Sequence, residues 1–136
     1  MQLCKAKGVI GKEWIEGYFC YGFYSDTPCI QDVNTHELTR IDMDTLCYDT
    51  GKVDKNGNRI WTNDMVTGIF SFDMPVEGKC IFKDGAYGLE WKNIYGNTQF
   101  AAFTSMCNIE YEVVGNAFDN PELSKEQAKE EIEPDR

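Results

Sequence analysis

The chain has only one histidine among its 136 residues, His36, and this residue lies in a polar stretch beside Glu37. Histidine-rich metal sites and catalytic sites that use paired imidazoles are therefore excluded. A nucleophilic pair of one cysteine with His36 stays open, although nothing in the local sequence marks one of the thiols as activated. The simplest interpretation of His36 is a solvated loop residue.

Basic residues are scarce, since 13 Lys and Arg stand against 23 Asp and Glu, which gives a formal net charge of -10. Binding to a phosphate backbone needs positive charge over at least one face, so nucleic acid is an unfavourable partner. Any local basic patch would have to be assembled from residues that occur singly: Lys52, Lys55, Arg59, Lys79, Lys83 and Lys92. Such an acidic surface could instead imitate DNA and occupy the basic cleft of another protein.

Long apolar runs are missing as well. No stretch approaches the roughly 20 residues that span a membrane, and the start MQLCKAKGVIG has no apolar core of signal-peptide length. We therefore expect an intracellular protein that does not associate with membranes and whose six cysteines stay reduced. The nearest two, Cys20 and Cys29, are nine positions apart, so the close pairs of structural zinc sites are lacking and we expect core or strand cysteines.

Motifs for cofactors and catalysis are also absent. The sequence contains no phosphate-binding glycine loop, no nucleophile elbow and no dinucleotide fingerprint. Asp54, Asn56 and Asn58 alternate like the start of a calcium loop. However, Arg59 stands at the sixth position, where glycine is needed, and Met65 at the twelfth, where a glutamate is needed. We predict no catalytic residues, no cofactor, no metal and no enzymatic activity.

Aromatic residues, by contrast, are abundant, with eight Phe, seven Tyr and three Trp. A chain of this length and composition is expected to fold around one core. The aromatic cluster between residues 14 and 24, punctuated by Gly17, predicts a hairpin or a bent pair of strands. Further along, Val33, Leu38 and Ile41 are expected to point inward, and Asp42–Asp44 to form a turn or a single helical turn.

The clearest local signal is the run Asp54-Lys55-Asn56-Gly57, which lies between Val53 and the apolar pair Ile60-Trp61. Aspartate at the first turn position can cap the chain through its carboxylate, while Asn and Gly tolerate the positive φ of a tight reversal. The run therefore predicts a hairpin turn.

Short strands are predicted along the rest of the body. One is expected to run from Asp64 to Phe72, to end at Pro75 and to be followed by a turn at Glu77-Gly78. Lys83-Asp84-Gly85 predicts a turn between two further strands, and later strands are expected near residues 100–103 and 109–114. Many short strands at regular turn spacing are typical of a barrel or a sandwich.

The end of the chain changes character. Asn120-Pro121-Glu122 supplies an N-cap, a first-turn proline and an early acidic residue, which favour the start of a helix. From Ser124 onward the apolar residues form too narrow a stripe to hold a helix firmly against the body.

Two segments combine turn residues and core residues in a distinctive order. The first is Thr50-Gly51-Lys52-Val53-Asp54-Lys55-Asn56-Gly57-Asn58-Arg59-Ile60 leading to Asp64-Met65-Val66, and the second is Val114-Gly115-Asn116 leading to Asn120-Pro121-Glu122-Leu123. Both resemble the YopX-like family of phage and prophage proteins. The family usually has glycine where Asn63 stands here, and asparagine is the next-best residue for a positive φ.

The resemblance implies a mainly β protein with a small Src-homology-type barrel, an additional N-terminal β-rich portion and a short C-terminal helix or tail. We accordingly predict one β-rich domain over residues 1–118, with an N-terminal portion of about 1–50 and a barrel portion of about 51–118. An acidic helical or flexible tail over 119–136 would follow. Within the motifs, Val53, Ile60, Val66 and Val114 are expected to point inward.

The resemblance also implies self-association into a homo-oligomer, a place in the host cytoplasm and no established activity. Our leading hypothesis is a non-enzymatic phage accessory protein that acts through contacts with an unidentified host or phage protein. One alternative is a small barrel associated with nucleic acid, which would require Lys52, Lys55 and Arg59 to converge on one groove. Another is an acidic DNA mimic that inhibits a DNA-binding protein.

Overall fold

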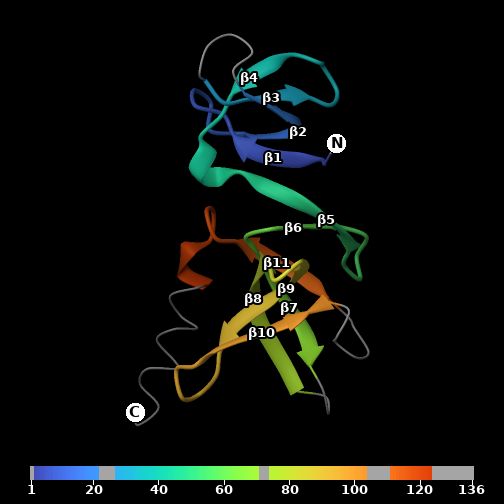
Figure 1. The fold of residues 1–136 in the computed structure, drawn as a ribbon, viewed down its shortest axis with the longest axis vertical. Helices are drawn as coiled ribbons and strands as arrows, with labels where there is room; N and C mark the ends of the chain where they lie inside the picture. The colour runs from blue at the N-terminus through green and yellow to red at the C-terminus, as the bar shows by residue number, and fades with distance from the viewer. Residues whose placement is uncertain (1, 22–26, 71–73, 104–110, 124–136) are drawn as a thin grey trace. The chain divides into compact units, whose positions relative to one another are not determined.

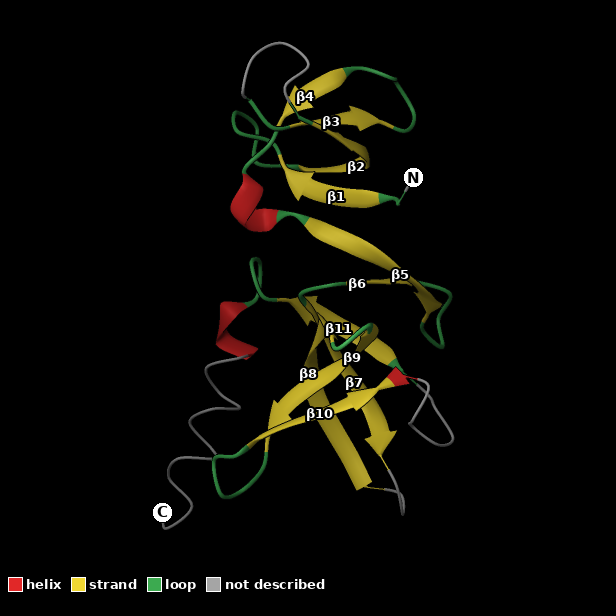
Figure 2. Ribbon diagram, viewed as in Figure 1, coloured by secondary structure: helices red, strands yellow, loops and turns green. Residues whose placement is uncertain are grey.

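The computed structural model describes residues 2–21, 27–70, 74–103 and 111–123. The chain divides into two compact units, Met1–Asp49 and Thr50–Arg136. Antiparallel strands make up most of the described chain in both units (Figure 2), which confirms the predicted mainly β fold. The single domain over residues 1–118 stays a prediction.

The first unit is an antiparallel meander. Its strands are β1 (Cys4–Lys7), β2 (Trp14–Cys20), β3 (Cys29–Asp32) and β4 (Leu38–Arg40). They pair in the order β4-β3-β2-β1, and the start of β5 (Cys47–Val53) pairs with the other side of β1 (Figure 1). The expected strand pair within residues 14–24 is one continuous strand, β2, as far as Cys20, and residues 22–24 lie outside the described part.

The core of the first unit follows from strand alternation, which places residues two apart on the same face. The register sets Ala6 opposite Ile15 and Cys4 opposite Gly17. The buried cluster therefore gathers on one face of the sheet, with Phe19 and Leu46 packed against it: Cys4, Ala6, Ile15, Ile30 and Ile41. The predicted inward position of Ile41 is confirmed.

The second unit contains a five-stranded antiparallel sheet in the order β10-β9-β8-β7-β11. Its strands are β7 (Asp64–Phe70), β8 (Met74–Lys83), β9 (Ala86–Lys92), β10 (Thr98–Ala102) and β11 (Glu112–Asn116). β5 runs on into this unit, and β6 (Arg59–Trp61) lies beside it after a hairpin turn. The buried core consists of Ile60, Val66, Val76, Cys80, Leu89, Ala101, Phe103 and Tyr111.

This sheet is open in the part of the chain that the structure describes. β10 and β11 are its two edges, and the two are not hydrogen-bonded to each other. The predicted closed barrel of the Src-homology type is therefore not confirmed.

β8 is longer than expected from the sequence. The predicted stop at Pro75 and the predicted turn at Glu77-Gly78 are wrong, because both lie inside β8, where Pro75 is opposite Ile69 and Gly78 opposite Val66. β8 pairs with β7 up to Lys79 and with β9 from Lys79 onward. Pro75 thus occupies the half of the strand that has a described partner on one side only, where a residue without an N–H is tolerated.

Three valines that were expected inside are exposed. Val33 lies in the turn after β3, and Val53 is the last residue of β5 before the hairpin turn. Val114 sits in β11 where the pairing with β7 shifts register between Val113 and Gly115, so it points away from the core. Ile60 and Val66 are fully buried, as predicted.

The hairpin turn predicted at residues 54–57 is confirmed. Asp54 Oδ1 accepts hydrogen bonds from the backbone N–H groups of Asn56 at 3.0 Å and Asn58 at 2.8 Å. The Gly57 N–H donates to the Asp54 carbonyl at 3.0 Å, and Gly57 has a φ of 82°. The carboxylate and the glycine together close the turn, as the sequence indicated.

A second hairpin turn, between β9 and β10, repeats this arrangement and was not predicted. Asn93 Oδ1 accepts the N–H groups of Tyr95 and Asn97, each at 3.0 Å. The Gly96 N–H donates to the Asn93 carbonyl at 2.9 Å, and Gly96 has a φ of 78°. The runs Asp54-Lys55-Asn56-Gly57-Asn58 and Asn93-Ile94-Tyr95-Gly96-Asn97 therefore form the same turn.

Two further turn predictions are confirmed. Asp84 and Gly85 form the two-residue loop between β8 and β9, with φ values of 51° and 84°. Asn63, at the position where the family usually has glycine, has a φ of 73°.

Helical structure is limited to short segments in the described residues. A 3-10 turn, η1, spans Met43–Thr45, and the chain is helical from Pro121, where the Leu123 N–H donates to the Asn120 carbonyl at 3.1 Å. The tail from Ser124 lies outside the described residues. Nowhere in the described ranges does a helix reach the length and apolarity needed to cross a membrane.

Candidate functional site

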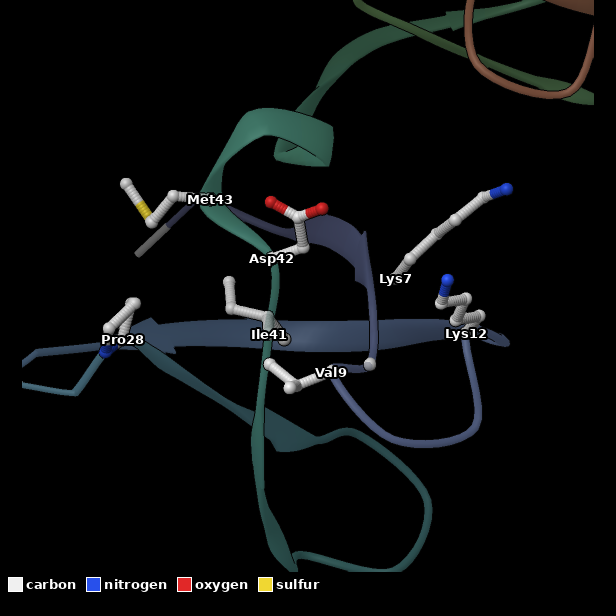
Figure 3. A pocket seen from close by; sticks show the side chains of 8 residues that line it. Lys7, Val9, Lys12, Pro28, Ile41, Asp42 and Met43 are labelled. Carbon is white, nitrogen blue, oxygen red and sulfur yellow. The ribbon is translucent and has the colours of Figure 1, made fainter.

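The first unit has an open cavity of about 450 Å³ (Figure 3). It lies between the loop that joins β1 to β2 and the segment that leads from β4 into η1. Its volume falls within the range of about 300 to 1,000 Å³ that is usual for ligand-binding pockets. The lining residues are Lys7, Gly8, Val9, Lys12, Pro28, Ile41, Asp42 and Met43.

Backbone hydrogen bonds hold the walls of this cavity. Gly8 forms an isolated antiparallel bridge with Ile41, so the β1–β2 loop lies against the chain that follows β4. Three N–H donors fasten the walls to each other: Val9 to the carbonyl of Arg40 at 3.0 Å, Ile41 to that of Pro28 at 3.1 Å and Asp42 to that of Lys7 at 2.9 Å. The cavity is therefore built into the fold.

The helical turn η1 positions one side of the cavity. Asp42 caps it, because its Oδ1 accepts the Asp44 N–H at 3.0 Å. The buried Thr45 hydroxyl donates to the Asp42 carbonyl at 2.7 Å and accepts the Lys7 N–H at 2.8 Å. These bonds confirm the helical turn predicted at Asp42–Asp44, and they hold Met43 at the edge of the cavity.

The cavity combines an apolar interior with a charged rim. Ile41 is buried, whereas Val9 is 52% exposed and Met43 is 45% exposed. Figure 3 shows Lys7 and Lys12 on one side and Met43 and Pro28 on the other, with Ile41 between them. A cavity lined by both exposed and buried apolar side chains can accommodate an apolar group, and the charged lining residues can orient it.

Lys12 has an unusual backbone conformation. Its φ of 56° lies in the left-handed region, which glycine and asparagine adopt more readily than lysine. The turn that contains it is closed by the Lys12 N–H, which donates to the Gly8 carbonyl at 3.1 Å. A lysine is thus kept at the cavity although the backbone there would favour a smaller residue.

Comparison with protein families assigns the chain. A family model described as YopX protein matches residues 19–125, which is well over half of the sequence. The chain belongs to the YopX family. No curated protein matches it. The resemblance noted in the two motif segments is thereby confirmed.

The range matched by the family model contains only some of the residues that line the cavity of this YopX family member. Pro28, Ile41, Asp42 and Met43 lie inside residues 19–125, whereas the β1–β2 loop with Lys7, Val9 and Lys12 precedes them. Ile41 and the turn at Asp42–Asp44 were predicted as structural features, but the cavity was not, because its residues come from three separate segments that only the strand topology brings together. The separations of these residues along the chain match no known binding motif.

His36 and the described cysteines do not line this cavity. His36 lies in an exposed turn after β3, with a φ of 63°. Beside it, the N–H groups of Thr35 and Asn34 donate to Asp32 and lower the pKa of that carboxyl, and the charge of His36 adds to this effect. Among the residues that the structure describes, no group of three or more His, Cys, Asp and Glu could hold a metal ion.

The cysteines of this YopX family member occupy strands and the core, as predicted for those that are described. Cys4, Cys47 and Cys80 are fully buried, Cys29 is buried at the start of β3, and Cys20 is partly exposed. Burial raises the pKa of the Cys4 thiol, outweighing a backbone hydrogen bond with the opposite effect. Its sulfur donates to the Gly17 carbonyl at 3.4 Å, so it acts as a protonated hydrogen-bond donor.

We expect Cys4, Cys47 and Cys80 to react with iodoacetamide at least about tenfold more slowly than Cys20 in the native protein, because a buried thiol reacts only after local opening. Mass spectrometry of tryptic peptides after timed labelling measures the rates. In denaturant all four should react at similar rates, which provides the control. A native rate for Cys4 equal to that of Cys20 would contradict the burial.

Three of the basic residues considered for nucleic acid lie beside acidic or aromatic groups. Lys55 pairs with Glu112, with Nζ and Oε1 3.5 Å apart. Lys79 on β8 stands directly opposite Glu90 on β9, so the charges alternate across the sheet. Lys83 places its ammonium 5.7 Å from the centre of the Phe100 ring. Lys52 and Arg59 are exposed on β5 and β6.

Proposed function

We propose that this protein is a non-enzymatic phage accessory protein that binds another protein through the cavity of its first unit. The observation that carries the proposal is that the exposed Val9 and Met43 line the same cavity as the buried Ile41, in walls fixed by backbone hydrogen bonds. Exposing apolar side chains to water in a preformed cavity costs free energy. This cost is removed when a bound partner covers the side chains. Membership of the YopX family supports the phage-type assignment.

The charge at the rim indicates the kind of partner. Two of the three charged residues that line the cavity, Lys7 and Lys12, are basic, although the chain as a whole has a net charge of -10. We infer that the cavity takes an apolar or aromatic side chain that is carried on an acidic surface. The lysines would steer that surface toward the cavity, and the apolar contact would supply the affinity.

The architecture of the second unit supports a further part of the proposal, that it follows the plan of a small Src-homology-type barrel. β8 pairs with a different neighbour in each half, as the long strand of a strongly curved sheet does. We also propose that the protein is located in the host cytoplasm and that it self-associates, as the family resemblance implies.

Nucleic-acid binding has less support, because Lys55 and Lys79 each face a glutamate. An oligonucleotide that bound the protein at low salt and dissociated as salt was raised would favour that alternative. Competition with DNA for a DNA-binding protein would favour the DNA-mimic alternative.

We expect photo-crosslinking at position 43 to capture a partner protein. Met43 is replaced by p-benzoylphenylalanine, which reacts with C–H bonds of whatever occupies the cavity, and the protein is irradiated in a bacterial lysate. The same replacement at the exposed Val33, which does not line the cavity, is the control. Mass spectrometry should identify a protein attached at position 43 and not at position 33.

The identified protein is then purified and its dissociation constant measured. Met43→Asp should weaken binding at least about tenfold, since it places a charge against the apolar contact, whereas Val33→Asp should leave binding unchanged. Equal crosslinking at both positions, or equal affinities of the two aspartate variants, would argue against the cavity as the contact site.

A further inference from the structure

Two cysteines of the first unit stand directly opposite each other on neighbouring strands. The antiparallel register of β2 and β3 pairs Cys20 with Cys29, and both are free thiols. Directly opposed residues of an antiparallel pair place their side chains on the same face of the sheet. The fold therefore brings together two thiols that lie nine positions apart in the sequence.

The spacing of directly opposed residues suits a disulfide. Their Cα atoms lie about 4.5 to 5.5 Å apart, and a disulfide joins Cα atoms that are about 4.4 to 6.8 Å apart. Their Cβ atoms, about 4.5 to 5.5 Å apart, need to approach by about 1 Å. Cys20 and Cys29 are the last pair in the register of β2 and β3, so no following pair of this ladder has to move.

The two thiols make weak hydrogen bonds along their own strands. The Cys20 Sγ donates to the Tyr18 carbonyl and the Cys29 Sγ to the Thr27 carbonyl, both at 3.6 Å. Thiols are weak donors, so little is lost when these bonds break. Cys20 is partly exposed whereas Cys29 is buried, so an oxidant in solution reaches Cys20 first.

The other described cysteines are not opposed to one another. Cys4 and Cys47 lie on paired strands, but Cys47 stands opposite Lys5, the residue next to Cys4. The side chains of Cys4 and Cys47 therefore point to opposite faces of the sheet. Cys80 stands opposite Leu89. In the described part of the chain, β2 and β3 thus carry the one pair of directly opposed cysteines.

We propose that Cys20 and Cys29 form a reversible redox site, which a small-molecule disulfide converts into a cross-strand disulfide. The Cys20 thiolate attacks the small disulfide and expels one small thiolate, which leaves a mixed disulfide at Cys20. The Cys29 thiolate then attacks the Cys20 sulfur, forms the new S–S bond and expels the second small thiolate. The protons lost by the two cysteines go to the two expelled thiolates. An excess of the small thiol reverses both steps.

The disulfide acts on the wall of the first-unit cavity. Pro28 lines the cavity and directly precedes Cys29, and its carbonyl accepts the Ile41 N–H at 3.1 Å. Cys29 is also paired with Arg40 of β4, whose carbonyl accepts the Val9 N–H at 3.0 Å. A cross-link at Cys29 therefore ties β2 to the segment that holds two of the wall contacts. The redox site goes beyond the proposed function and does not depend on what the cavity binds.

The test incubates the full native chain with oxidised and reduced glutathione at a series of ratios and then alkylates the remaining thiols with iodoacetamide. Cys20 and Cys29 share one tryptic peptide, residues 13–40, so their disulfide appears as an unalkylated peptide that has lost two hydrogen atoms. We expect this product to form at least about tenfold faster than any disulfide of the fully buried Cys4, Cys47 or Cys80. An excess of reduced glutathione should remove it.

A displaced pair of cysteines is the matched control. Cys29→Ser with Gln31→Cys keeps one thiol on each strand and on the same face, because Gln31 is two positions from Cys29 and stands opposite Tyr18. The diagonal separation from Cys20, about 7 to 8 Å between Cα atoms, is too long for a disulfide. This variant should form the cross-strand disulfide at least about tenfold more slowly than the wild type and stop at the mixed disulfide with glutathione.

Hydrogen exchange measures the effect on the cavity wall. Oxidation should slow exchange of the Ile41 N–H at least about threefold in the wild type, because the cross-link restrains the segment that bears its acceptor, and should leave the displaced pair unchanged. Unchanged exchange in the cross-linked wild type would overturn the link to the cavity.

Equal rates of disulfide formation in the wild type and the displaced pair would overturn the redox site. The same holds for a wild type that keeps glutathione on Cys20, or that joins Cys20 or Cys29 to another cysteine first. Capture of a partner at position 43 tests the proposed function separately, so either proposal can fail while the other stands.

Discussion

Replacing Asp54 with alanine is expected to lower the free energy of unfolding of the second unit by about 3 kcal/mol. The Asp54 carboxylate accepts three backbone N–H groups, from Asn56 and Asn58 at Oδ1 and from Val113 at Oδ2, at 3.0, 2.8 and 3.0 Å. The bond to Val113 fastens the hairpin to a chain segment 59 positions away. Without the carboxylate, part-buried N–H donors would lose their acceptor.

Urea unfolding followed by tryptophan fluorescence measures this change, with Trp14→Phe as the background so that the signal comes from the second unit. The matched control is Asn93→Ala, which removes the equivalent acceptor from the other hairpin turn. Asn93 is bonded to two N–H groups within its own turn, so we expect a cost of about 1 kcal/mol. Equal costs for the two substitutions would contradict the role assigned to the Val113 bond.

The pH dependence provides an independent check of the Asp54 carboxylate. Burial acts to raise its pKa, but the N–H donors of Val113, Asn58 and Asn56 outweigh burial and hold the pKa below its ordinary value of 3.8. A carboxyl with a lowered folded-state pKa contributes stability that is fully present above about pH 3.8 and is lost as the pH falls through the folded value. The stability difference between wild type and Asp54→Asn should therefore shrink below pH 3.8, whereas a constant difference would contradict the assignment.

Turns were the part of this fold that the sequence predicted best. Asp54-Lys55-Asn56-Gly57, Asp84-Gly85 and Asn63 all depend on a side-chain acceptor or a positive φ within a few residues, and those requirements can be read locally. The turn at residues 93–97 obeys the same chemistry. It was missed because its apolar tip, Ile94-Tyr95, looks like part of a strand.

The ends of the strands, and the face to which each side chain points, depend on the neighbouring strands. The sequence alone does not identify those neighbours. Pro75 continues β8 because that half of the strand has one described partner, and Val114 turns outward because β11 shifts its register there. The cavity could not be predicted for a related reason. Its rim joins Lys12 to Asp42 through the meander of β1 to β4, and residues so far apart leave no pattern in the sequence.

Gly17 is where the first unit is most sensitive to added volume. β2 and β3 approach so closely that a Cβ on Gly17 would overlap the Gln31 carbonyl oxygen and stand 2.8 Å from Ile30 Cγ2. The obstacle is largely backbone, which cannot move aside without breaking the pairing of the two strands. We expect Gly17→Ala to destabilise the first unit by about 3 kcal/mol or more, because overpacking a sheet interior forces backbone shifts.

Gly11→Ala is the matched control in the neighbouring loop. The closest atoms to a Cβ there belong to the flexible side chain of Glu13, at 3.4 to 3.8 Å, so we expect a change within about 0.5 kcal/mol. Hydrogen exchange of the β1, β2 and β3 amides measures both variants in the unit concerned. Gly17→Ala should accelerate exchange across all three strands, because Gly17 lies between the two partners of β2, opposite Cys4 and Asp32. Unchanged exchange in that variant would show that β2 and β3 are not held as closely as their register requires.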